Sequence, residues 1–121
     1  MLRMIAAVSC FLTFFLVNPS SGAQMLAGIG SIKCSALSAQ LDAANEADKG
    51  ELSVALEEWA FGYMSGLNKA SPKEERRKID DINGEALSSY VVELCSEYED
   101  ATVMQIVNAI YRDLAVQNAT S

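Results

Sequence analysis

Apolar side chains recur three or four positions apart over most of this chain beyond residue 33, which is the spacing of one face of an α-helix. The longest apolar stripe predicts the longest helix of the protein. Its members are Leu52, Ala55, Leu56, Trp59, Ala60, Tyr63 and Leu67. We expect this helix to end within residues 68–72, because Pro72 has no backbone N–H group with which to continue it.

A shorter stripe precedes this helix. Cys34, Leu37 and Leu41 share a helical face and predict a short helix that ends near Asn45. The polar residues 42–50 are then predicted to form a loop or a frayed extension of that helix.

Two more helices are predicted beyond residue 82. Asn83 is suited to cap the first of them, because its side-chain oxygen can accept a hydrogen bond from a free backbone N–H group. The apolar residues of that helix are Leu87, Tyr90, Val91, Leu94 and Cys95. Thr102 and Gln105 have the capping-box spacing at the start of the last helix. The apolar face of the last helix consists of Val103, Ile106, Val107, Ile110 and Leu114.

These patterns predict an all-α fold, a small bundle of three main helices plus a short N-terminal helix. The alternation of apolar and polar residues that is typical of strands does not occur. The ordered core is expected over about residues 34–115, within one domain.

The first 23 residues have the pattern of an export signal. Arg3 precedes an apolar stretch over 4–17, and small residues at 21–23 permit cleavage before Gln24. The stretch is shorter than the roughly 20 apolar residues that a membrane-spanning helix requires. We therefore expect a cleaved signal over 1–23, a single helical domain over 24–121, a periplasmic location and no membrane attachment after cleavage.

The expected mature chain is strongly acidic. It keeps sixteen Asp and Glu but eight Lys and Arg, because Arg3 is removed, so its formal charge is −8. Such a surface repels nucleic acid and anionic lipid, which excludes both as partners. The partners that remain are other proteins.

Cys34 and Cys95 are the two cysteines of the expected mature chain, and they allow a single intramolecular pairing. A metal site or a nucleophilic thiol would call for histidine partners, and the chain contains no histidine. A structural disulfide is therefore predicted, which by chain entropy would contribute about 4 kcal/mol to the free energy of unfolding. No residues indicate a catalytic site, a metal site or a cofactor, so the protein is not expected to be an enzyme.

Several apolar or helix-terminal residues are candidates for contact with a client or partner protein. They are Leu56, Trp59, Tyr63, Leu67, Asn68, Ile106 and Ile110. Trp59 can be a core residue or, if exposed, an anchor for a partner. Gly62 and Gly66 lie on one helical face and are expected to let another backbone pack closely, either within the chain or in a homodimer. The mixed-charge segment 73–78 can be a solvated turn or a docking patch for an acidic partner.

The order of these motifs resembles that of the HdeA/HdeB-like family of small periplasmic helical proteins. The similarity rests on four segments: Cys34, the aromatic and glycine-containing helix 59–68, the link 79–82 and the helix end 91–95. It covers about residues 34–114. The same layout is similar to that of the type VI secretion amidase immunity proteins.

These resemblances imply two functions. The first implies an acid-stress chaperone that loosens at low pH and binds unfolded periplasmic clients. The second implies an immunity or inhibitor protein that binds a secreted toxin while folded. In a chain without histidine, the side chains that can respond to acid are carboxylates, which ordinarily titrate near pH 4.

Overall fold

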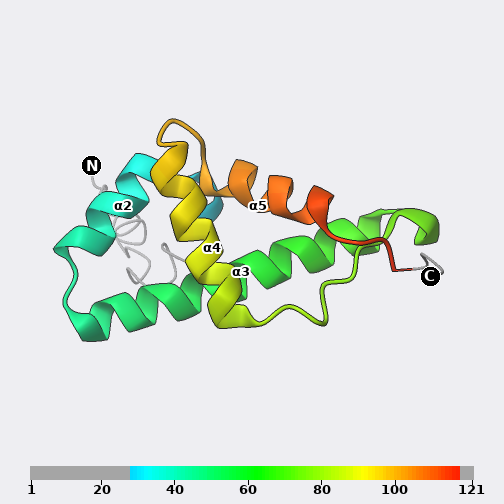
Figure 1. The fold of residues 1–121 in the computed structure, drawn as a ribbon, viewed down its shortest axis with the longest axis horizontal. Helices are drawn as coiled ribbons and strands as arrows, with labels where there is room; N and C mark the ends of the chain where they lie inside the picture. Colours follow the sequence, from blue (N-terminus) through cyan, green and yellow to red (C-terminus); the bar gives the residue numbers. More distant parts are fainter. Residues whose placement is uncertain (1–27, 118–121) are drawn as a thin grey trace, which may run out of the picture.

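The computed structural model describes residues 28–117 and confirms an all-α fold (Figure 1). The elements follow in the order η2 (Ile29–Ser31), α2 (Cys34–Ala43), α3 (Glu46–Ala70), η3 (Lys73–Glu75), α4 (Gly84–Glu97) and α5 (Val103–Asp113), where η denotes a 3-10 helix. Within residues 28–117 the extended pairings are two isolated antiparallel bridges, Lys33 with Thr102 and Arg77 with Val116. The expected export signal lies outside the described residues.

Helix α3 begins earlier than its apolar pattern predicts. The prediction of a loop or frayed extension over 42–50 is wrong, because only Ala44 and Asn45 separate α2 from α3. The Asn45 side chain caps α3 by accepting a hydrogen bond of 2.8 Å from the backbone N–H of Asp48. Glu46 and Asp48 in the first turn also favour this start, since negative charge is stabilised at the amino end of a helix.

The amino end of α2 is capped by backbone carbonyl groups of the connection between α4 and α5. Lys33 provides no side-chain cap, and the N–H groups of Cys34 and Ser35 donate to the carbonyls of Ala101 and Glu99, at 2.8 and 3.1 Å. The connection between α4 and α5 therefore closes over the start of α2.

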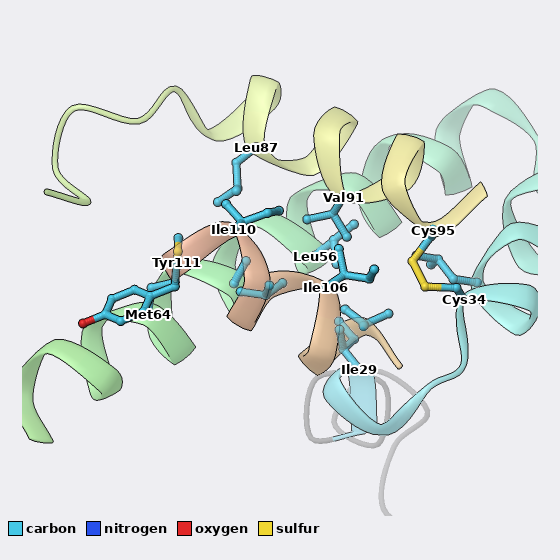
Figure 2. Packing of buried hydrophobic residues seen from close by; sticks show 14 of the residues in the cluster. Ile29, Cys34, Leu56, Met64, Leu87, Val91, Cys95, Ile106, Ile110 and Tyr111 are labelled. Carbon is cyan, nitrogen blue, oxygen red and sulfur yellow. A yellow bond between two sulfur atoms is a disulfide. The ribbon is translucent and has the colours of Figure 1, made fainter. Parts of the chain in front are cut away.

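The predicted disulfide is present. Cys34 opens α2 and Cys95 lies in the last turn of α4, and both side chains are fully buried. The bond fixes α2 against α4 across 61 residues of sequence. Figure 2 shows it at one end of the hydrophobic cluster, with Tyr111 at the other.

The core lies where α3, α4 and α5 meet, and α5 also packs against η2. Helix α4 crosses α3, whereas α5 runs alongside it (Figure 1). Ile29 in η2 belongs to this core with 2% of its surface exposed, so the packed region begins before the residue 34 that we expected.

The predicted caps of the last two helices are confirmed. The Asn83 side chain accepts from the N–H of Ala86 at 3.0 Å and starts α4. Thr102 and Gln105 form the reciprocal capping box of α5. These caps could be predicted from the sequence because each capping side chain forms its hydrogen bond with a backbone group of the same turn.

Candidate functional site

Three of the candidate contact residues are core residues in the folded chain. Leu56, Ile106 and Ile110 are 1%, 6% and 7% exposed, and all three belong to the main hydrophobic cluster (Figure 2). In the folded protein a partner can therefore reach little of their surface. They would be fully exposed if α5 separated from α3, α4 and η2, against which it packs.

Trp59 is partly buried: it packs against the hydrophobic cluster and keeps part of its surface exposed. Its indole ring stacks on the ring of Tyr63, with centroids 5.1 Å apart and planes inclined by 11°. Gly30 also approaches the indole so closely that a Cβ atom there would overlap the ring. Gly30 is thus required by close approach, and η2 covers Trp59 through this contact.

Asn68 forms a hydrogen-bonded junction, which we call the Asn68 junction, with Arg77 and Tyr111. Its amide group accepts from the Arg77 N–H at 2.8 Å and donates to the Arg77 carbonyl at 2.9 Å. The Tyr111 hydroxyl donates to the same Asn68 Oδ1 at 2.6 Å. The side chain of Asn68 thereby joins α3, the link after η3 and the end of α5.

Arg77 strengthens this junction. Its guanidinium donates to the carbonyl of Leu114 at 2.8 Å and lies over the Tyr111 ring, 5.9 Å from the centroid. The chain beyond α5 then runs beside the link, with Lys78 N–H donating to the Ala115 carbonyl at 2.8 Å. In the segment 73–78, Arg77 is therefore directed inward and is not part of a free docking patch.

Gly62 and Gly66 do not mediate close packing within the described chain. Both are exposed, and a Cβ atom at either position would meet no atom within 4 Å. Within residues 28–117 the expected close intramolecular approach is not found, because the core-facing stripe of α3 runs through Ala60, Met64 and Asn68 instead. A homodimer contact at these glycines stays a prediction.

An open groove of about 790 Å³ lies between the end of α2 and the first half of α3. Its lining is mostly apolar and includes Leu52, Val54 and Ala55, with Val54 52% exposed. The carboxylates that line it belong to Asp48, Glu51 and Glu58. We call this feature the α2–α3 groove. The apolar pattern alone did not reveal it, because the groove depends on how the end of α2 and the first half of α3 lie relative to each other.

A second, smaller groove of about 320 Å³ lies between α4 and α5. It is lined by Ile82, Ala86, Leu87, Tyr90, Ile110, Asp113 and Leu114. It follows the seam along which α5 packs on α4, so opening that seam would widen it.

Residues 28–117 contain neither a cluster of metal-ligating side chains nor a helix that could span a membrane. No group of three or more His, Cys, Asp or Glu side chains there is arranged to hold a metal ion. In the same range, no helix combines the length and the apolar character needed to cross a membrane.

Comparison with known proteins adds no relative. No protein-family model matches the chain, and neither a curated protein nor a solved structure matches it.

Proposed function

We propose that this chain is a periplasmic protein-binding protein whose first function is that of an acid-stress chaperone. The observation that carries the proposal is the position of α5. This helix buries Val103, Ile106, Val107, Ile110 and Tyr111, and it lies beyond Cys95, outside the loop that the disulfide closes. Helix α5 can therefore detach and release an apolar face while α2, α3 and α4 stay covalently tied.

The distribution of charge supports an acid trigger. Six of the eight Lys and Arg of the expected mature chain lie in segments 69–78 and 112, around the Asn68 junction. They are Lys69, Lys73, Arg76, Arg77, Lys78 and Arg112. Five carboxylates lie in the same part of the sequence, those of Glu74, Glu75, Asp80, Asp81 and Asp113.

Protonation of the carboxylates in acid leaves the positive charges of this region uncompensated. At neutral pH residues 69–81 and 112–113 together carry a net charge of +1, six Lys and Arg against five Asp and Glu, and with the five carboxylates protonated they carry +6. Like charges gathered in one region repel, which destabilises the compact state. Because Tyr111 anchors the end of α5 in this region through Asn68, repulsion there acts on the helix whose release exposes the core.

The test is a titration of the oxidised chain from Gln24 onward between pH 7 and pH 2. Trp59 fluorescence, sedimentation and protection of an acid-labile client from aggregation are followed together. We expect loosening below about pH 4, where carboxylates ordinarily titrate, with client protection over the same range. A chain that keeps its native signals to pH 2, or unfolds without protecting the client, would refute the chaperone function.

A pair of charge variants tests the trigger. Lys69→Gln with Lys78→Gln removes two positive charges from the region of the junction, and Lys33→Gln with Lys49→Gln removes two from elsewhere. The first pair is expected to move the loosening midpoint to lower pH than the second pair does. Equal shifts would mean that total charge, rather than its position, sets the response.

A second function, inhibition of a secreted toxin by the folded chain, is favoured by the α2–α3 groove. The groove is present without any loosening and offers exposed apolar surface through Val54. We propose no enzymatic activity for either function. Gel filtration of the folded chain with a candidate toxin at pH 7 tests the second function, and a complex is the expected result.

A further inference from the structure

The α2–α3 groove combines an apolar floor with carboxylates of one sign. Leu52, Val54 and Ala55 supply apolar surface from α3, and Ala43 and Ala44 supply it from the end of α2. All these side chains are small or medium in size. The floor can therefore receive a bulky apolar side chain from a partner.

The charged residues that line the groove are all acidic. Asp48, Glu51 and Glu58 line it, and no Lys or Arg is among the described residues that do so. The three carboxylates are spread over ten residues of α3, about 15 Å along the helix axis. A ligand with positive charges spaced along an apolar stripe would match both features at once.

We infer that the α2–α3 groove binds a basic amphipathic segment of a partner protein, with an apolar side chain of the segment on Val54 and its Lys or Arg side chains on Glu51 and Glu58. This inference rests on the proposed binding of a protein by the folded chain and names the chemistry of that partner. An amphipathic helix laid in an apolar groove is a common mode of recognition, and charge complementarity sets its orientation and partner choice.

The occupant is a protein segment rather than nucleic acid or anionic lipid, because the carboxylates repel both of those. A second copy of this chain is disfavoured by the charge of −7 over the full sequence, because two strongly acidic proteins repel each other. The groove remains charged only while its carboxylates are ionised. This mode of binding therefore belongs to neutral pH and is separate from the acid-released face of α5.

The experiment measures binding of a fluorescein-labelled peptide of alternating Leu and Lys in helical spacing to the oxidised chain from Gln24 onward at pH 7.5. A peptide with Glu in place of Lys is the ligand control. We expect saturable binding of the Leu/Lys peptide and none of the Leu/Glu peptide. Absence of saturable binding of the Leu/Lys peptide would overturn the inference.

Matched variants locate the site. Glu51→Lys with Glu58→Lys reverses two charges at the groove, and Glu93→Lys with Glu97→Lys reverses two exposed charges on α4, so both proteins have the same net charge. The groove pair is expected to lower the affinity for the Leu/Lys peptide about tenfold more than the α4 pair does. Equal weakening would show attraction to total charge only and would overturn the inference.

Val54 is tested by Val54→Asn, with Met104→Asn as the control, because both side chains are exposed and helical. Only the Val54 variant should bind the Leu/Lys peptide more weakly than the wild type does. Circular dichroism checks that each variant is folded. Self-association of the wild type that Glu51→Lys with Glu58→Lys abolishes, without peptide binding, would assign the groove to a second copy instead.

These outcomes are distinguishable from failure of the proposed function. A groove variant that loses the peptide but protects a client at low pH would show two separate binding modes. If the wild type does not bind the peptide but forms a complex with a toxin at pH 7, the folded-state function stands and uses a surface other than the α2–α3 groove.

Discussion

The Tyr111 hydroxyl donates a hydrogen bond of 2.6 Å to Oδ1 of Asn68, which joins side chains 43 residues apart in the sequence. The same Asn68 oxygen accepts from the backbone N–H of Arg77. One buried amide thus ties α3, the link and α5 together. The stability of α5 on the rest of the fold should depend on it.

Removing the Tyr111 hydroxyl tests this dependence. We expect Tyr111→Phe to lower the free energy of unfolding by about 1 kcal/mol, since one hydrogen bond is lost and the ring is kept. For a domain of this size that corresponds to a fall of roughly 4–8 °C in Tm. Tyr98→Phe is the control, because Tyr98 is 58% exposed, and it should leave Tm unchanged.

Asn68→Ala should cost more than Tyr111→Phe. It leaves both the Tyr111 hydroxyl and the Arg77 N–H without their acceptor, and such orphaned groups cost about 1–3 kcal/mol each. Urea unfolding of the two single variants and the double variant measures the difference. Strict additivity of the two changes would contradict the shared junction, because neighbours in one network are coupled.

Two glycines should respond to alanine with opposite sign. Gly30→Ala places a methyl group into the Trp59 indole, which should destabilise the protein by roughly 1–3 kcal/mol and alter Trp59 fluorescence. Gly62→Ala adds a methyl group to open space on an exposed helix and should stabilise by about 0.5–1 kcal/mol. Thermal unfolding monitored by circular dichroism compares the two. A destabilised Gly62→Ala variant would point to a contact at that face, such as a homodimer.

The capping box of α5 offers a fourth test. Thr102→Ala removes the acceptor for the Gln105 N–H and should lower stability by about 1 kcal/mol, with Thr102→Ser restoring most of it. Hydrogen exchange should show faster opening at the start of α5 than in α4. If α4 amides accelerate equally, α5 does not open on its own.

Disulfide removal should affect the whole domain. We expect Cys34→Ala with Cys95→Ala to lower the free energy of unfolding by about 2–4 kcal/mol, because the unfolded chain gains the freedom of a loop of 61 residues. Urea unfolding of the double variant against the oxidised protein measures this loss. In acid, the variant should lose compactness, whereas the oxidised chain keeps α2 against α4. Equal acid expansion of the two proteins would show that the disulfide does not restrain the loosened state.

Local signals in the sequence predicted most of the helices. Asn83, Thr102 and Gln105 satisfy backbone groups within a single turn, so their roles needed no knowledge of the fold. Asn45 is a cap of the same kind, but the polar run around it concealed the start of α3. A polar turn can be helical when it extends a helix whose remaining turns are buried.

The candidate site was only partly predictable. Asn68 was selected at the end of a helix, but its partners Arg77 and Tyr111 are 9 and 43 residues away, and no local pattern connects them. Gly62 and Gly66 were expected to pack closely, yet their face of α3 is exposed because the core lies on the opposite side. The α2–α3 groove depends on how two helices diverge and has no motif of its own.

The sequence by itself determined the helical class, the caps of α4 and α5 and the pairing of Cys34 with Cys95, because each follows from spacing along the chain or from residue count. The tertiary structure alone decided which side chains are reachable. Ile106 and Ile110 are buried because α5 packs against α3, α4 and η2, whereas Val54 on α3 stays 52% exposed. Spacing assigns residues to a face, and only packing determines what that face meets.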